Sequence, residues 1–417
     1  MLQGVATNGT SPSPSVNGDG YWLPSEPVAL VMCIIALAAW GSWGNLLKLS
    51  GVRYELFFAD YILGSLIPAV TFSPLLAGSA FTAGIDFGSM LLAMLAGIIN
   101  TLGTIGIMVA IELSGLTVAV PVIVGVEICI GTTMLYVLER EENPVLLFSG
   151  IAFCAAAVIL DSLAHCQSKH DEDDGAGGGV PGAASRVSSY GLLLSDEDFA
   201  ADVHEFSKTK AGKIRAKPYR YRFSLPSSRS FVASGNGHGS KSRGIVVALI
   251  TGVFFSLWPV LASVTTNSCG PALSPYTFFT FFRAGACVGG CVFFPLLGRL
   301  DLVPGKDPAT VAEYVRLSRW QHLYGVAAGA IWALGTLFTV VGGETVGLAI
   351  SVSITRCSPL VAALWGVFYW GETKAASNRT KVLIALMMLS YVLAISLIAA
   401  ASPSKEDRAA AMVARCG

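Results

Sequence analysis

Long apolar segments separated by short polar connections make up most of the chain. Ten of these segments are long enough to cross a membrane as helices, since about 20 apolar residues span the hydrocarbon core of a bilayer. They lie at 28–47, 57–77, 88–110, 115–138, 144–163, 244–264, 276–298, 320–342, 346–370 and 380–401. This pattern predicts an all-α membrane protein with ten transmembrane helices.

A hydrophilic stretch, 164–243, divides the ten segments into two sets of five. It holds twelve of the 27 Lys and Arg residues and nine of the 27 acidic residues. Such a composition cannot bury an apolar core, so we expect a disordered central loop. The predicted organisation is therefore a first five-helix repeat over 28–163 and a second over 244–401, with a disordered N-terminus over 1–27 and a tail over 402–417.

The basic residues predict which way the chain crosses the membrane, because Lys and Arg accumulate in cytosolic connections. If the central loop is cytosolic, nine further Lys and Arg residues in other connections lie on its side, and only four lie on the opposite side. This count predicts a cytosolic loop and an extracytosolic N-terminus. We expect the plasma membrane as the location, with an endomembrane as the alternative.

The two halves share a sequence repeat. A shift of 232 residues lays Leu95–Val120 on Ala327–Val352 with eleven of 26 positions identical, whereas composition alone gives about three. Each half has five predicted helices, so the two copies cross the bilayer in opposite directions. Inverted repeats of this kind are typical of transporters, whose substrate site lies at the midplane between the halves.

Four charged residues fall inside the predicted spans, where each costs about 2.5–3.5 kcal/mol on insertion scales. They are Asp60, Glu127, Arg283 and Arg356. Glu127 is repeat-related to Pro359, which is one helical turn from Arg356. We expect Glu127 and Arg356 to face each other across a central cavity, where the Arg356 fork suits planar carbonyl groups and Glu127 titrates or accepts N–H groups. A static ion pair that ties helices together is the alternative.

Asp60 and Arg283 lie nearer the ends of their segments. Aligning the Phe-Phe pairs at 57–58 and 281–282 places Asp60 one residue from the equivalent of Arg283. This second acid and base are candidates for substrate or proton coupling as well. The alternative is that their side chains extend to the membrane interface.

Two tryptophans are candidates for stacking on a flat substrate. Gly44 and Asn45 follow Trp43, and Pro259 follows Trp258. These neighbours weaken a helix, and a broken helix exposes backbone groups to a ligand. An aromatic face at such a place suits a heterocycle or the C–H face of a sugar.

Composition argues against several other functions. Only 13% of residues are charged and mean hydropathy is +0.63, against roughly a quarter charged in soluble domains. All five histidines lie at span ends or in loops, and no catalytic carboxylate pair or His cluster falls within a span, so we expect neither an enzyme nor a metal or other cofactor. The zero net charge gives no indication of nucleic-acid binding.

One Gly-rich stretch, 234–244, resembles a phosphate-binding loop without matching it. That motif requires a glycine directly before the lysine, but Ser240 precedes Lys241 and the nearest glycine is Gly239. We therefore expect no nucleotide at Gly235–Ser242. The basic residues here suit contact with anionic lipid headgroups at the entry of the sixth segment.

Several motifs resemble one known family. The sequences "WGSWGNLLKLSG", "FFADYILGSLI", "IGTTMLYVLE" and "PLVAALWGVFYWGE" are similar to those of plant-type ureide permeases, in the drug/metabolite transporter superfamily. The resemblance covers 28–163 and 244–401 and includes a long central loop. It implies a proton-coupled importer of allantoin-like ureides or, in some members, of uracil or xanthine.

The leading hypothesis is thus a secondary active transporter that moves a small polar heterocycle with a proton by alternating access. A sugar or nucleotide-sugar transporter with the same fold is the alternative within this class. A membrane receptor or regulatory protein that acts through its central loop is the alternative from another class.

Overall fold

The computed structural model describes residues 21–82, 85–114, 116–176, 237–267, 272–297, 309–371, 373, 376–404, 410, 411, 413 and 414. Within these residues the chain forms helices and no β-strand. Ten helical spans are long and apolar enough to cross a membrane. The predicted fold class is confirmed as an all-α protein with ten spans.

Eight of the ten spans are single helices. They are α1 (Glu26–Ser50), α2 (Tyr54–Ala77, continued by the 3-10 turn Gly78–Phe81), α3 (Phe87–Ser114), α6 (Pro144–Ala176), α8 (Gly237–Thr266), α9 (Pro275–Leu297), α11 (Arg319–Val346) and α14 (Asn378–Ala400). A short helix, α10 (Val311–Val315), precedes α11.

The fourth and ninth spans are interrupted. The fourth consists of α4 (Leu116–Val126), a π-helical turn (Glu127–Thr132) and α5 (Thr133–Glu139), and the ninth of α12 (Leu348–Thr355), α13 (Pro359–Leu364) and a second π-helical turn (Trp365–Trp370). Pro359 is the first residue of α13, and proline both starts a helix well and cannot continue the preceding one. Such interruptions free backbone groups inside a membrane protein, and π-helical turns often occur at functional sites.

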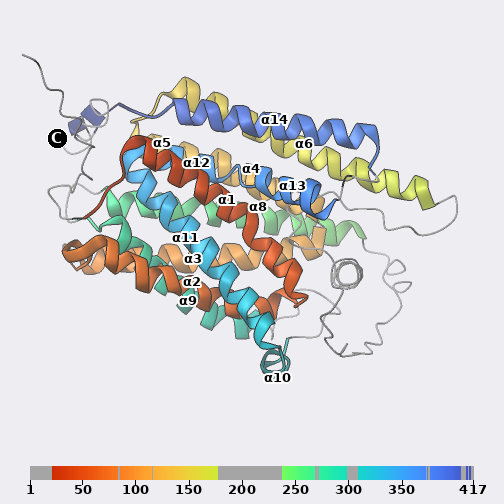
Figure 1. Ribbon diagram of the computed structural model, residues 1–417, viewed down its shortest axis with the longest axis horizontal. Helices are drawn as coiled ribbons and strands as arrows, with labels where there is room; N and C mark the ends of the chain where they lie inside the picture. Colours follow the sequence, from red (N-terminus) through yellow and green to blue (C-terminus); the bar gives the residue numbers. More distant parts are fainter. Residues whose placement is uncertain are drawn as a thin grey trace, which may run out of the picture.

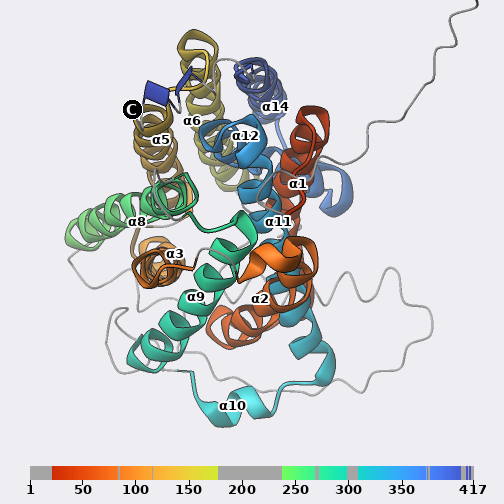
Figure 2. The same cartoon turned by 90° about the vertical axis from the view of Figure 1, so that its left-hand side faces the viewer.

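The helices form one bundle with a separate pair along one edge, α6 and α14 (Figures 1 and 2). Among the other spans, α1 packs along α11 and α3 packs along α8, while α2 packs on α11 and α3 on α9. We call the end where α6 ends and α8 begins the loop end. The opposite end, where α5 ends and α12 begins, is the distal end (Figure 1).

Close helix contacts depend on glycines that have no room for a side chain. A Cβ at Gly97 in α3 would overlap the carbonyl oxygen of Phe282 in α9. A Cβ at Gly329 in α11 would overlap the carbonyl oxygen of Tyr61 in α2 in the same way. Small residues allow this approach of two backbones, which stabilises helix packing in membranes through close van der Waals contact.

Two further glycines complete these interfaces from the facing helices. Gly64 in α2 lies against the carbonyl oxygen of Val326, and Gly285 in α9 lies against that of Met94. In both interfaces, α2 with α11 and α3 with α9, each helix therefore contributes one such glycine.

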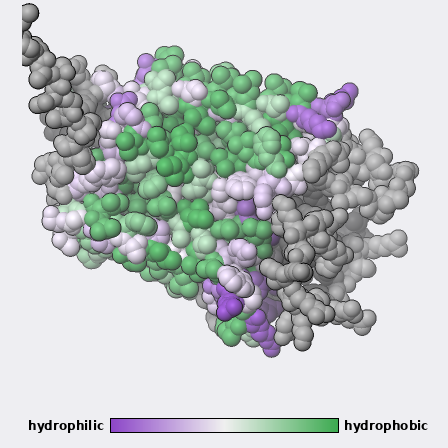
Figure 3. Space-filling view, in the orientation of Figure 1, coloured by the Kyte–Doolittle hydropathy of each residue, from purple (hydrophilic) through white to green (hydrophobic). Residues whose placement is uncertain are grey.

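The outer surface of the bundle is apolar, as a lipid environment requires. Large hydrophobic side chains such as Leu63, Val70, Leu75, Ile159 and Leu389 are more than half exposed. Figure 3 shows hydrophobic residues over much of the helical surface on one face, with hydrophilic ones gathered toward the ends. The polar and charged side chains inside the bundle are accordingly the ones that need a separate explanation.

The helices extend into regions that the sequence suggested were disordered. α6 continues to Ala176 and α8 begins at Gly237, so both enter the predicted loop 164–243, and the stretch from Gly237 to Ser242 belongs to α8. The rest of that predicted loop, including Gly235, lies outside the described residues. At the N-terminus, Trp22 and Pro24 accept hydrogen bonds from Tyr276 and Thr345 through their carbonyl oxygens, so the end of the predicted disordered segment 1–27 is packed on the distal end.

Candidate functional site

Glu127 and Arg356 form a buried ion pair in the middle of the bundle. Glu127 is the first residue of the π-helical turn in the fourth span, and Arg356 lies at the break between α12 and α13. Nη2 of Arg356 contacts Oε1 of Glu127, and the two side chains are only 11% and 6% exposed. The structure therefore brings these two predicted residues together at the points where their spans are interrupted.

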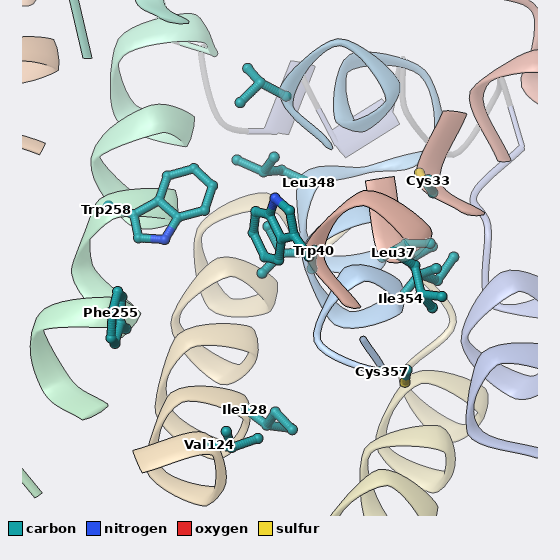
Figure 4. Packing of buried hydrophobic residues seen from close by; sticks show 14 of the residues in the cluster. Cys33, Leu37, Trp40, Val124, Ile128, Phe255, Trp258, Leu348, Ile354 and Cys357 are labelled. Carbon is teal, nitrogen blue, oxygen red and sulfur yellow. The ribbon is translucent and has the colours of Figure 1, made fainter. Parts of the chain in front are cut away.

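Tryptophans surround the guanidinium of Arg356. Its carbon lies 5.0 Å from the ring centre of Trp40 and 6.0 Å from that of Trp258. Figure 4 shows these two indoles next to each other, and they meet edge to face, with 63° between their planes. Cation–π attraction of this kind contributes about 2 kcal/mol when the charge is desolvated, so the rings help to hold the cation in place.

A cavity of about 150 Å³ adjoins the ion pair. Since a water needs roughly 10–15 Å³ on this measure, the cavity has room for on the order of ten waters or one small organic molecule. Its aromatic walls come from Trp40, Trp43, Tyr54, Tyr61, Phe255, Trp258 and Trp332, and its polar lining includes Asn100, Thr104, Glu127, Arg356 and Ser358. Aromatic walls with a few convergent polar groups are typical of small-molecule sites.

The four residues predicted at the centre of the protein, Glu127, Arg356, Trp43 and Trp258, all line this cavity. Their positions differ in detail from the expectation. Trp258 is almost fully buried against Phe282, at 5.3 Å between ring centres, while Trp43 packs on Tyr61 at 5.2 Å.

Asp60 and Arg283, the second predicted acid and base, do not line the cavity and do not form an ion pair with each other. Asp60 lies near the loop end, where its Oδ1 accepts a hydrogen bond from the Tyr314 hydroxyl at 2.5 Å and its Oδ2 lies 2.7 Å from Nδ1 of His322. Asp60 and Arg283 are 3% and 1% exposed, so both side chains are buried within the protein.

Arg283 is held within α2, α9 and α11. Its Nη2 donates to the Ser65 hydroxyl at 2.5 Å, and its guanidinium lies over the rings of Trp332 and Phe282 at 5.0 and 5.5 Å. Among the described residues, its Nε and Nη1 have no hydrogen-bond partner. The buried cation is therefore stabilised mainly by the aromatic faces of Trp332 and Phe282.

The two arginines are linked through a stack of rings. Trp40 lies parallel to Trp332, with 5.6 Å between ring centres and 6° between planes. Arg356 covers the Trp40 ring and Arg283 covers the Trp332 ring. The two arginines are therefore joined by a continuous row of ring contacts along one side of the cavity.

Sequence reasoning missed Asn100, Trp332, Tyr314 and His322. Asn100 in "INTLGT" is repeat-related to Trp332 in "IWALGT", a polar-for-aromatic difference inside a matched motif that marks both positions. Asn100 is 4% exposed and its Oδ1 has no hydrogen-bond partner among the described residues. The hydrophobic pattern gives no indication of His322 and Tyr314. Their contacts with Asp60 join α11 and α10 to α2 and depend on how these helices pack.

A metal site is not found in the described part of the chain, since no group of three or more His, Cys, Asp or Glu side chains lies together there. The cavity offers instead an ion pair, an amide and aromatic faces. Such groups can bind and orient an organic molecule.

The contact of Tyr314 with Asp60 predicts a loss of stability on removal of one hydroxyl. Burial, with a smaller contribution from the Asp60 carboxylate, raises the pKa of Tyr314 to about 12, so its hydroxyl remains a donor throughout the physiological pH range. Tyr314→Phe should cost about 1.5–3 kcal/mol, as hydrogen bonds to charged groups do, and lower the thermal unfolding midpoint of the purified protein. Tyr324→Phe is the control, because the Tyr324 hydroxyl has no partner in the described residues; equal midpoints for both variants would contradict the prediction.

These features define a class before any relative is considered. Ten spans with a cavity between interrupted helices are characteristic of integral, multi-pass membrane transporters. Comparison with known proteins then identifies the family. The sequence model of the ureide permease family matches residues 79–401, and the chain belongs to that family. Its members are transporters and not enzymes.

Individual relatives agree along nearly the whole chain. Ureide permeases 1 and 2 of Arabidopsis thaliana are each 25% identical to it over 93% of this chain and 100% of their own length. A probable glucose uptake protein of Priestia megaterium is 24% identical over 37% of this chain and 45% of its own. A crystal structure with 13% identity superposes with a TM-score of 0.52 over 89% of this chain and 98% of the other, which supports the fold alone.

Proposed function

We propose that this protein is a secondary active transporter of small polar heterocycles, with allantoin-like ureides as its main substrates and uracil and xanthine in the same chemical class. Proton symport by alternating access drives the transport. The observation that carries the proposal is the cavity in which the Glu127–Arg356 pair meets the faces of several tryptophans. The names of the relatives, ureide permeases 1 and 2, support the same substrate class.

The cavity lining suits a flat, neutral molecule rich in N–H and C=O groups. Trp43 and Trp258 offer aromatic faces for stacking. Arg356 donates in a planar fork that matches carbonyl oxygens, and Asn100 has a buried oxygen that a substrate N–H would satisfy. An unmet polar group in a cavity costs about 1–3 kcal/mol, so a ligand that pairs with Asn100 gains that amount over one that does not.

Glu127 gives the site a way to couple substrate binding to a proton. In the ion pair, its carboxylate occupies Nη2 of Arg356. A proton on Glu127 neutralises the carboxylate and weakens the pair, because the attraction between opposite charges is lost. The guanidinium is then available to substrate carbonyl groups, so proton and substrate bind together. Asp60 and Arg283 lie outside the cavity lining and act on this site only through Tyr61, Trp332 and Trp40.

Close contacts between glycines and backbones support two related halves. Met94 and Gly97 are displaced by 232 residues from Val326 and Gly329, the same shift as the sequence repeat. Met94 and Gly97 contact Gly285 and Phe282, and Val326 and Gly329 contact Gly64 and Tyr61 in the same way. The corresponding partners, Gly64 with Gly285 and Tyr61 with Phe282, lie 221 residues apart in the sequence. The matched contacts favour a register for the second and seventh spans in which Asp60 corresponds to Phe281 rather than to a neighbour of Arg283.

The position of the cavity supports alternating access. Lining residues such as Tyr54 at the start of α2, Ile107 in α3 and Val120 in α4 lie toward the loop end. The distal end is tied by hydrogen bonds between elements, among them Tyr276 to Trp22 and Thr345 to Pro24. We infer that the structure is a state closed at the distal end. We also propose that the central loop lies in the cytosol and that the protein resides in the plasma membrane.

A sugar is the second candidate substrate. The partial match to a probable glucose uptake protein favours it, and aromatic rings also pack on the C–H faces of sugars. The Glu127–Arg356 pair and Asn100 provide both hydrogen-bond acceptors and donors. The hydroxyl groups of a sugar can pair with both kinds.

Uptake measurements decide among these proposals. Cells that express the protein should accumulate labelled allantoin more than control cells, more at acidic than at neutral external pH, and less with a protonophore. Glucose uptake should remain at the control level. Accumulation of glucose without allantoin would overturn the substrate, and allantoin uptake indifferent to pH and to the protonophore would overturn proton coupling.

A further inference from the structure

A buried carboxylate at the distal end connects the two halves of the chain. Glu139, the last residue of α5, accepts hydrogen bonds from the Ser263 hydroxyl at 2.7 Å and the Asn267 amide at 3.2 Å through Oε1, and from the backbone N–H of Leu348 at 3.1 Å through Oε2. All three donors belong to the second half, at the end of α8 and the start of α12. Glu139 is 2% exposed, so this contact between the two halves is buried.

A second carboxylate lies beside this contact without such support. Glu142 is 4% exposed, and among the described residues no side chain and no other segment donates a hydrogen bond to its carboxyl oxygens. It packs on Gly347, whose φ of +96° and lack of a side chain make room for it; a Cβ there would lie 2.6 Å from Oε1 of Glu142. The tight fit at the α11–α12 turn leaves the carboxyl group no way to reach solvent while the end is closed.

The charges around Glu142 disfavour its ionised form. Glu139 and Glu141, from the same segment, both act on it with negative charge. The groups that approach Glu139 from α8 and α12 are neutral: a hydroxyl, an amide and a backbone N–H. Burial raises the pKa of Glu142 to about 8, and repulsion by Glu139 and Glu141 adds to this effect. Backbone N–H groups of the same segment oppose the rise.

We propose that Glu142 is a proton-binding site that controls the opening of the distal end, distinct from Glu127 in the cavity. The proton sits on Glu142 while Glu139 holds α8 and α12, and it leaves when these elements separate and water reaches the carboxyl group. The proposal rests on the alternating-access part of the proposed function. The proton is bound and released on the distal side, so it does not cross the membrane. It therefore controls access to the cavity and is not a second coupling ion.

The direction of the pH effect follows from linkage. The closed state has the raised pKa, and the open state has a value nearer the ordinary one of about 4.3 for a hydrated Glu. The closed state therefore binds more protons, so it is favoured as pH falls and is lost as pH rises toward 8. An acidic medium on the distal side promotes closure, and a more alkaline one promotes opening.

A native thiol can report the opening. Cys33 in α1 is 0% exposed, and its Sγ donates to the Ser351 hydroxyl of α12 at 3.2 Å. It lies in the half of α1 nearer the distal end, so a hydrophilic methanethiosulfonate reagent reaches it when α12 moves away from Glu139 and, with it, from α1. The assay uses the full chain in lipid nanodiscs without any substrate, with Cys33→Ala to identify the signal from this thiol.

The test compares the rate of Cys33 modification in the wild type and in Glu142→Gln across pH, because the ratio removes the pH dependence of the thiol reaction itself. The ratio should rise by up to about tenfold per pH unit from mildly acidic pH toward pH 8, as release of one proton per opening requires. Glu141→Gln, which removes a neighbouring charge but keeps the Glu142 carboxyl group, should retain the rise of the ratio with pH and shift it only slightly toward lower pH.

A constant ratio across pH would overturn the proposal, and so would a Glu141→Gln variant that behaves as Glu142→Gln does. Failure of Glu142→Gln to fold would also overturn it, because the neutral isostere should fit best where the carboxyl group carries a proton. The assay needs no transported substrate, so absent ureide uptake would contradict the proposed function and leave this result unchanged.

Discussion

Arg356→Gln should abolish uptake of allantoin and reduce the amount of folded protein in the membrane. The substitution removes the partner of Glu127, a side chain that is only 6% exposed. Loss of one member of a buried ion pair typically costs about 3–5 kcal/mol, since the remaining charge stays buried and unpaired. It also removes the fork that we propose binds substrate carbonyl groups, so two separate losses are expected.

The double variant Glu127→Gln/Arg356→Gln separates these two losses. With both charges removed, the amount of folded protein should recover, while uptake should stay absent because neither the guanidinium nor the titrating carboxyl is present. Surface expression and uptake are measured for the same cells, with Arg379→Gln, at an exposed position in α14, as the matched control. Recovery of uptake in the double variant would mean that the pair is a static link between helices.

Gly329→Ala should destabilise the protein strongly, although the added group is a single methyl. A Cβ at this position would overlap the carbonyl oxygen of Tyr61 and lie 2.9 Å from the backbone nitrogen of Ser65. These are backbone atoms that cannot rotate away, so α2 and α11 must separate. Overpacking of this kind costs typically about 1–3 kcal/mol and occasionally more, and the thermal unfolding midpoint should fall by several degrees.

Gly125→Ala is the control, because a Cβ at Gly125 would meet no atom within 4 Å. Alanine is intrinsically better than glycine in a helix by about 0.8–1.0 kcal/mol, so this variant should be as stable as the wild type or more so. The related position Gly97 should repeat the effect of Gly329 against α9. A tolerated alanine at Gly329 would contradict the close contact of α2 with α11.

The sequence was sufficient for the spans and for the central pair. Runs of apolar residues locate membrane helices because the bilayer imposes one length and one polarity on all of them. Charges inside such runs are costly, so Glu127 and Arg356 could be selected as partners from the repeat alone. Their roles in transport remain predictions.

The rest of the site depends on rotation and register, which hydropathy does not encode. The Phe-Phe pairs at 57–58 and 281–282 suggested one alignment of α2 with α9, whereas the glycine contacts of Gly64 and Gly285 favour another. The stack of Trp40 on Trp332 joins residues far apart in the chain, and the contact of Asp60 with His322 joins a span to the start of another. The π-helical turn that begins at Glu127 has no local sequence signal that distinguishes it from regular helix.

Counterflow in proteoliposomes tests the central claim most directly, because it requires the binding site and alternating access but no ion gradient. Vesicles that contain the purified protein are loaded with unlabelled allantoin and diluted into labelled allantoin. We expect transient accumulation of label in wild-type vesicles and none in vesicles with the folded double variant Glu127→Gln/Arg356→Gln. Equal accumulation in both, or none in wild-type vesicles, would contradict a ureide site at the Glu127–Arg356 pair.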